Sequence, residues 1–119
     1  METGIIIWHH AHCSASQRAL ELIRDAGFEP QIIDYLRDPP DRQTLNEVLA
    51  AAGLSPRGLL RDKEPTYAQL GLDDPAIDDA ALVEAMLRNP VLINRPVVIT
   101  KRGTLLCRPP ERVLEILPV

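Results

Sequence analysis

Short apolar runs alternate with amphipathic stretches at the start of the chain. Residues 5–8 form a β-branched apolar run, and residues 9–16 after it are small or polar. Apolar side chains then recur at helical spacing: Ala19, Leu22, Ile23 and Ala26. Gly27 suits the left-handed residue that ends a helix, and residues 31–35 supply a second strand. The pattern predicts a βαβ unit whose first loop lies at the carboxyl edge of the sheet, where ligands bind in open α/β sheets.

The middle of the chain is predicted to be helical. Apolar positions recur with a helical period before Gly53: Leu45, Val48, Leu49 and Ala52. Ser55 and Pro56 are the residue types that favour the cap and first turn of another helix. The acidic pair 78–79 precedes a third apolar stripe and suits the positive end of its dipole. We therefore expect a helical insertion at about 37–94.

The last part of the chain returns to strand patterns. Apolar runs at 97–100 and 104–107, separated by a short turn, predict a β-hairpin, and a closing helix follows. The bond Arg95-Pro96, which enters the hairpin, is a candidate for the cis isomer. The order is βαβ, helical insertion, ββα. This order predicts the α/β fold class, and we expect residues 1–119 to form a single domain.

Composition narrows the class of protein. The 119 residues are 45% hydrophobic and 25% charged, in the range of ordinary soluble domains, with a net charge of −4. The acidic balance argues against general nucleic-acid binding, which uses a broad basic surface. The apolar runs are too short for a membrane span, and the N-terminus has no secretory pattern. We expect a cytoplasmic monomer that binds neither nucleic acid nor membrane.

One of the two cysteines, Cys13, stands where the first predicted strand gives way to a helix. The free amides and the positive dipole end of that helix favour a thiolate over a thiol. The amides of residues 13–16 also suit a cradle for a tetrahedral anion. A free cysteine is otherwise a small buried hydrophobe, but a polar loop is a poor place for that role. Cys13 is therefore the candidate nucleophile.

All three histidines, His9, His10 and His12, flank this cysteine. An imidazolium would stabilise the thiolate, and we assign that part to His9, with the other two as partly exposed loop residues. The three histidines and Cys13 would alternatively bind zinc or a similar metal. Adjacent ligands are sterically awkward and a second distant ligand pair is absent from the sequence. We therefore predict no metal, with a metal-binding loop as an open alternative.

Three arginines follow apolar residues rather than lying in charge runs: Arg61, Arg95 and Arg108. A planar guanidinium at the junction of an apolar segment and a turn matches a tetrahedral oxyanion. Taken singly, each arginine is better explained as an ordinary surface charge. They can bind one anion together only if their segments share the sheet edge with Cys13.

The second cysteine, Cys107, is about ninety residues away from Cys13. Position 16 is Ser16, so no Cys-x-x-Cys motif forms and a resolving thiol must come from outside or from Cys107. Cys107 ends an apolar strand, where a packed core thiol is the expected role. Wide spacing and the lack of a secretory pattern favour free thiols in a reducing compartment.

Several motifs are specific enough to compare with a known family. They are residues 9–16 around Cys13, residues 57–61, the string 89–96 and the ending 106–109. In these segments the chain resembles the glutaredoxin-dependent arsenate reductases, the ArsC family, across nearly its whole length. The resemblance implies a thioredoxin-like fold with a helical insertion between the second strand and the hairpin.

The resemblance also implies an activity. The family's cysteine attacks arsenate to form a thioarsenate, glutathione attacks the arsenic adduct, and glutaredoxin completes the reduction to arsenite. Cys13 matches the nucleophile, His9 the histidine that favours its thiolate, and Ser16 a hydroxyl near the sulfur. The oxyanion-binding arginines of the family match Arg61, Arg95 and Arg108. Glutathione is then a co-substrate, and no tightly bound cofactor is expected.

The loop around the cysteine departs from the family's usual pattern. Ala11 replaces a proline, which removes a fixed φ, and Gln17 replaces an arginine, which removes a positive charge near the thiolate. Alternatives therefore stay open: a thiol transferase acting on glutathione mixed disulfides, a non-catalytic regulatory or binding protein, or the metal-binding loop. The complete set of arginines counts against the regulatory protein.

Overall fold

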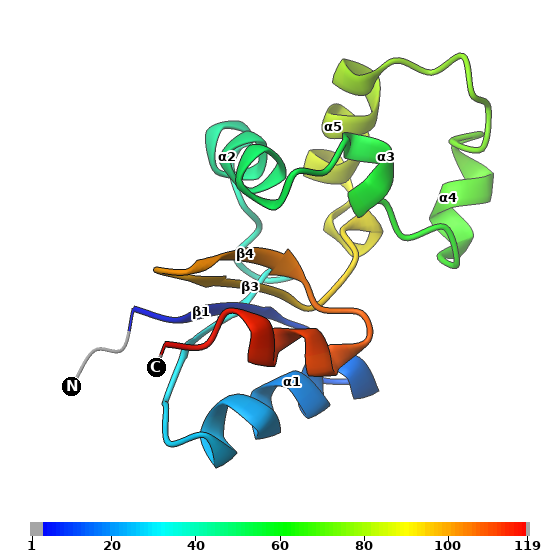
Figure 1. Ribbon diagram of the computed structural model, residues 1–119. Coiled ribbons are helices and arrows are strands. Elements are labelled where there is room, and N and C mark those ends of the chain that lie inside the picture. The colour runs from blue at the N-terminus through cyan, green and yellow to red at the C-terminus, as the bar shows by residue number, and fades with distance from the viewer. Residues whose placement is uncertain (1–3, 119) are drawn as a thin grey trace. The chain divides into compact units, whose positions relative to one another are not determined.

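The computed structural model describes residues 4–118, and the chain divides into two compact units (Figure 1). The first unit combines residues 1–38 with residues 95–119, and the second consists of residues 39–94. All four strands of the described chain lie in the first unit, whereas the second is helical. No helix in this described part is long and apolar enough to cross a membrane.

The sheet of the first unit has the order β2-β1-β3-β4. Its strands are β1 (Ile6–His9), β2 (Gln31–Asp34), β3 (Val97–Thr100) and β4 (Gly103–Leu106). β1 is parallel to β2 and antiparallel to β3, and β3 and β4 form the hairpin. The predicted βαβ unit and hairpin are confirmed, each strand lying within one residue of its expected position. The Arg95-Pro96 bond is cis, as is Arg108-Pro109.

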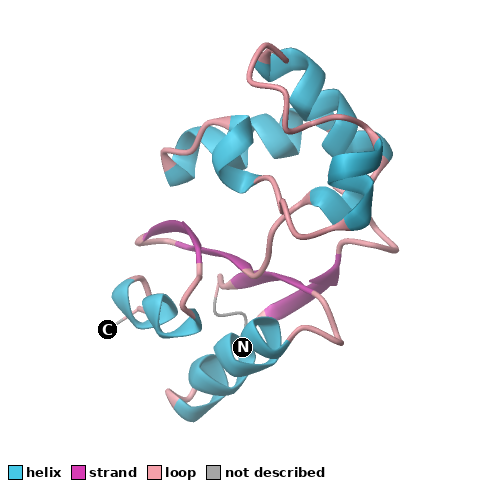
Figure 2. Cartoon of the chain, turned by 90° about the vertical axis from the view of Figure 1, so that its right-hand side faces the viewer, coloured by secondary structure: helices cyan, strands magenta, loops and turns pink. Residues whose placement is uncertain are grey.

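One face of the sheet is covered by α1 (Ser14–Asp25) and the 3₁₀ helix η2 (Pro110–Glu115), which lie side by side (Figures 1 and 2). Strand alternation turns Ile7 toward this layer, and its register partner is Val98. Both are fully buried in one cluster with Ile23 of α1 and Val113 of η2. This core fixes the start of α1, and therefore Cys13, relative to the sheet.

The closing helix is tighter than an α-helix. Its N–H groups bond three residues back, as Arg112 does to the carbonyl of Pro109 and Ile116 to that of Val113. The sequence pattern predicts a helix here but does not distinguish the two hydrogen-bond ladders.

The second unit contains five helical segments within residues 39–94. They are α2 (Arg42–Ala52), α3 (Pro56–Leu59), α4 (Pro65–Gln69), α5 (Asp79–Arg88) and the 3₁₀ helix η1 (Pro90–Leu92). The predicted cap at Ser55 is confirmed, because its side chain accepts from the N–H of Gly58. At the start of α5, Asp78 of the predicted acidic pair accepts from the N–H of Ala81. Gly53 ends α2 in the left-handed conformation, with φ of 67°. Helix α4 was not predicted, because none of its side chains is buried and it therefore has no apolar stripe.

Candidate active site

The β1–α1 connection places Cys13 at the N-cap of the first helix. Its backbone is extended, with φ of −101° and ψ of 120°, and its N–H donates to the carbonyl of His10 at 3.1 Å. Among residues 4–118, no side chain hydrogen-bonds to this helix end as a cap. The first-turn amides are therefore directed toward the sulfur, and Cys13 is buried with 9% of its surface exposed.

These surroundings change the acidity of the Cys13 thiol. Burial alone raises its pKa, but hydrogen bonds from the Ser16 amide, the Arg95 guanidinium, the Ser16 hydroxyl and the Ala15 amide outweigh that effect. Together they lower the pKa from 9.0 to about 7. The Ser16 hydroxyl is fully buried and makes no hydrogen bond of ordinary geometry within the described residues, so its proton can rotate toward the thiolate.

Two of the predicted arginines lie beside this sulfur. Nη1 of Arg108 is 4.0 Å from Sγ of Cys13 and also donates to the backbone carbonyl of Arg95 at 2.9 Å. Arg95 is itself buried, with 6% of its surface exposed, and its guanidinium donates to the sulfur. The hairpin and the first helix thus bring together residues that are more than eighty positions apart in the sequence. A thiolate and two guanidinium groups form a site suited to an oxyanion.

His9 ends strand β1 next to the loop that carries Cys13. Burial lowers the pKa of His9, an effect that the Asp34 carboxylate opposes and Arg24 reinforces. His9 is not one of the groups that lower the pKa of Cys13. Its Nε2 is buried without a hydrogen-bond partner in the described structure. The role assigned to His9 from the sequence stays a prediction.

The third arginine, Arg61, lies in the second unit. Residues 59–61 run antiparallel to residues 92–94, with the N–H of Arg61 donating to the carbonyl of Leu92. Its guanidinium donates to Glu64 at 3.1 Å and to the side-chain oxygen of Asn94 at 3.2 Å. The side chains of this ion pair are only 18% and 19% exposed, so Arg61 is held in place rather than free on the surface. Sequence reasoning gave neither partner a role in the site.

Loop residues 10–12 form a small network of their own. The His12 N–H donates to Nδ1 of His10 at 3.1 Å, and the side-chain amide of Gln17 donates to the carbonyl of Ala11. Within residues 4–118, no group of three His, Cys, Asp or Glu side chains is placed to hold a metal ion. The metal-binding alternative therefore has no set of ligands in this arrangement.

The second cysteine is buried in the core cluster of the first unit and has no measurable exposure. Burial raises the pKa of Cys107 to about 12, the opposite direction to Cys13. A thiol of this acidity in a closed core agrees with the packing role expected for Cys107.

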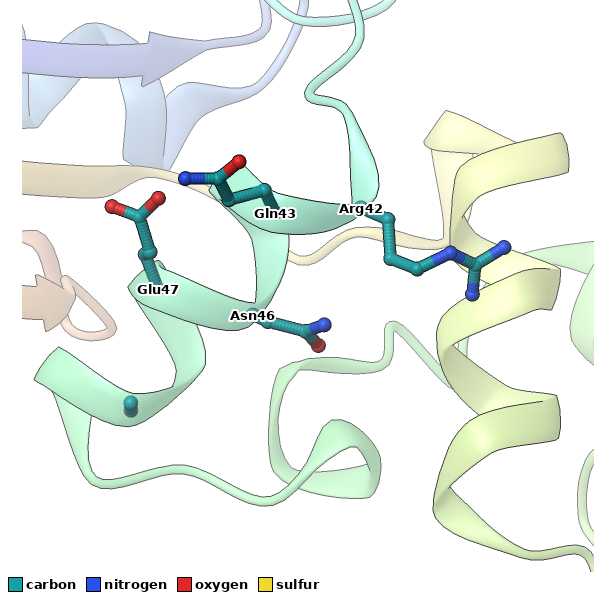
Figure 3. Close-up of a pocket in the computed structure, with 5 residues that line it drawn as sticks. Arg42, Gln43, Asn46 and Glu47 are labelled. Carbon is teal, nitrogen blue, oxygen red and sulfur yellow. The ribbon is translucent and has the colours of Figure 1, made fainter.

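A surface cavity elsewhere in the molecule contains none of the candidate residues. It has a volume of about 630 Å³ and is lined by the α2 residues Arg42, Gln43, Asn46, Glu47 and Ala50. Figure 3 shows the Arg42 side chain extending toward α5, where it pairs with Glu84. The cavity brings no nucleophile together with cations, so we do not assign the chemistry to it.

Fold and site together define a class, the thioredoxin-like α/β proteins with a single activated thiol. Within that class the chain belongs to the ArsC family, whose model matches residues 8–116. It is 48% identical over 114 residues to the arsenate reductase of Rhizobium meliloti (strain 1021), covering 96% of this chain and 81% of that protein. It is also 48% identical over 116 residues to the arsenate reductase of Escherichia coli (strain K12), covering 98% and 82%.

The architecture is shared with solved structures. The arsenate reductase from Vibrio cholerae superposes with a TM-score of 0.93 at 38% identity, covering 98% of this chain and 100% of that one. The predicted thioredoxin-like fold with a helical insertion is thereby confirmed.

Proposed function

We propose that the protein reduces arsenate to arsenite through Cys13, with glutathione and glutaredoxin as the reductants. Relatives named arsenate reductase, at 48% identity over nearly the whole chain, support the choice of substrate. The observation that carries the proposal is the position of Arg108, 4.0 Å from a sulfur whose pKa is about 7. An oxyanion held by that guanidinium and by Arg95 is in reach of a nucleophile.

In the first step the Cys13 thiolate attacks arsenic, an S–As bond forms, and one arsenate oxygen leaves as water after protonation. Arsenic stays pentavalent. Glutathione then forms a second S–As bond as another oxygen leaves as water. The arginines Arg95 and Arg108 stabilise the charge that develops on the remaining oxygens. Because these cations are held by the backbone and by burial before the substrate arrives, little reorganisation is needed.

The reduction itself occurs when a glutaredoxin thiolate attacks the glutathione sulfur. The glutathione S–As bond breaks, its electron pair reduces arsenic to the trivalent state, and a glutathione–glutaredoxin disulfide forms. Water then releases arsenite and restores the Cys13 thiol. Overall, arsenate and two thiols yield arsenite, one disulfide and one water, so two electrons are transferred. No second thiol of this chain is needed, which agrees with the buried state of Cys107.

The remaining predicted residues have supporting parts in this proposal. Ser16 supplies a hydroxyl to the thiolate, and His9 is proposed as the residue that favours the thiolate form of Cys13. Arg61 is proposed as a third arginine for the oxyanion, supported by the family match. The reaction uses no tightly bound cofactor. Both reductants require a reducing compartment, so we place the protein in the cytoplasm, as a monomer.

Purified protein incubated with arsenate, glutathione and glutaredoxin tests the proposal. We expect arsenite to accumulate, and we expect Cys13→Ser to abolish its production. Omitting glutaredoxin or glutathione in turn identifies the reductants. Arsenite no higher than with Cys13→Ser would refute the reductase.

A parallel reaction with a glutathione mixed disulfide in place of arsenate distinguishes a thiol transferase from an arsenate reductase. Turnover of the mixed disulfide without turnover of arsenate would favour a thiol transferase. Loss of activity with Cys13→Ser in only one of the two reactions would show that they use different groups.

A further inference from the structure

The loop that presents Cys13 contains no proline, and hydrogen bonds hold its shape. The Cys13 N–H donates to the carbonyl of His10, and the His12 N–H donates to Nδ1 of the same residue. A third bond comes from outside the loop, because the side-chain amide of Gln17 donates to the carbonyl of Ala11. The first two bonds shape the loop, and the third joins the loop to helix α1.

Helix geometry explains why Gln17 reaches this carbonyl. Gln17 lies four residues after Cys13, and its own N–H donates to the Cys13 carbonyl at 3.0 Å. Residues four apart share one face of a helix, and helical side chains lean toward the N-terminus. The Gln17 amide is thereby carried past the N-cap to the loop that precedes it.

We propose that Gln17 is a positioning residue for the Cys13 thiolate: by holding the carbonyl of Ala11, it keeps the sulfur against the first-turn amides of α1. The proposal rests on Cys13 being the nucleophile of the proposed function. The test of the positioning role measures the thiol itself and needs no arsenate. The positioning role and the reductase activity can therefore fail independently.

The direction of the effect follows from what acidifies the thiol. Hydrogen bonds from the amides of Ser16 and Ala15 stabilise the thiolate and weaken steeply as distance and angle depart from the ideal. If the loop opens, the sulfur loses these bonds and regains water. Both the acidifying bonds and the burial that opposes them are lost, so the pKa of Cys13 returns toward 9.0.

The chain offers a way to restore loop order without Gln17. Within the described residues, the N–H of Ala11 donates no hydrogen bond, so a proline there removes none. A proline ring would fix φ at that residue and reduce the freedom of the loop. Ala11→Pro should therefore compensate for the loss of the Gln17 side chain, which a direct electrostatic role of Gln17 would not allow.

The test is the thiolate titration of Cys13, followed by ultraviolet absorbance as the difference between each variant and its Cys13→Ser counterpart. Gln17→Ala should raise the midpoint by about half a pH unit to one unit, the range of one hydrogen bond. Gln17→Asn keeps an amide on a shorter side chain and should give the same rise. Adding Ala11→Pro to Gln17→Ala should return the midpoint to about 7.

The position is exposed on a helix, and alanine is the best helix former, so Gln17→Ala keeps the fold. Gln43→Ala, an exposed glutamine of α2, is the matched control and should leave the midpoint unchanged. An unchanged midpoint in Gln17→Ala would overturn the proposal. A wild-type midpoint in Gln17→Asn would assign the effect to the amide dipole and overturn positioning, as would a rise that Ala11→Pro does not reverse.

Discussion

Alkylation of Cys13 as a function of pH tests the central property of this site. The pKa of the thiol is lowered from 9.0 to about 7. At pH 7 about half of Cys13 is therefore thiolate, against about 1% of a thiol of pKa 9.0, which is a ratio of about fifty. At pH 9 the ratio falls to about two, because the ordinary thiol is then itself half ionised.

The lowered pKa also makes the Cys13 thiolate a weaker nucleophile, which opposes the gain from its larger ionised fraction. A thiolate loses reactivity as its pKa falls, with a Brønsted slope of about 0.4–0.5, so a shift of about two units lowers the intrinsic rate about eightfold. Combined with the ionised fractions, Cys13 should react about sixfold faster than an ordinary cysteine at pH 7 and about fourfold slower at pH 9. The two rate curves therefore cross between these pH values.

The assay is the rate of carboxamidomethylation of the native protein from pH 5.5 to 9.5, resolved by peptide mass. The burial of Cys13 lowers its alkylation rate by the same factor at every pH and does not move the midpoint, so the midpoint is the decisive quantity. Cys107 is the internal control: it is fully buried with a pKa raised to about 12, and it should stay unmodified until the protein unfolds. A Cys13 midpoint at the ordinary value of about 9 would refute thiolate stabilisation.

Three further outcomes are expected. Arg108→Ala should lower kcat/KM for arsenate by about 10²-fold or more, which is the usual loss for one oxyanion donor. The control Arg18→Ala, on the exposed face of α1, should leave kcat/KM unchanged. Equal losses in the two variants would show that Arg108 is not part of the site. The lowered pKa of Cys13 stabilises the fold, and this contribution is fully present above pH 9 and is lost as the pH falls through 7. Chemical unfolding should therefore show the stability of wild type relative to Cys13→Ser rising by about 2.5 kcal/mol from pH 6 to 9.5, and a flat difference would contradict the shift. Arg61→Ala should lower arsenate turnover yet leave the Cys13 alkylation midpoint at about 7, because Arg61 is not one of the groups that set that pKa.

The sequence was most informative where local chemistry decides the structure. Short apolar runs predict the strands, and helical apolar spacing predicts the longer helices. The residues Ser55, Gly53 and Asp78 occupy the caps that their side chains or backbone favour. The position of Cys13 at a strand-to-helix junction is likewise a local property. It was therefore predictable that first-turn amides would acidify its thiol.

Features that depend on packing were not predictable in this way. The charge state of His9 depends on its burial, which lowers its pKa, and burial is set by the whole first unit. The Gln17 bond requires the actual path of the loop, because no spacing rule links a side chain to a carbonyl six residues earlier. The Glu64 and Asn94 contacts of Arg61 depend on the pairing of residues 59–61 with residues 92–94.

A pKa near 7 is the value that the proposed chemistry requires. A thiolate attacks best when its pKa is close to the ambient pH, since a lower value weakens the nucleophile and a higher one leaves it protonated. In the proposed reaction Arg95 also binds the incoming oxyanion. Burial of Cys13 opposes the negative charge that the amides and the Arg95 guanidinium favour on its sulfur. If the Arg95 guanidinium stabilised the thiolate more strongly, it would be bound more tightly to the sulfur and less available to the substrate. The balance between burial and hydrogen bonding therefore leaves the sulfur ionised, reactive and able to share its cations with the substrate.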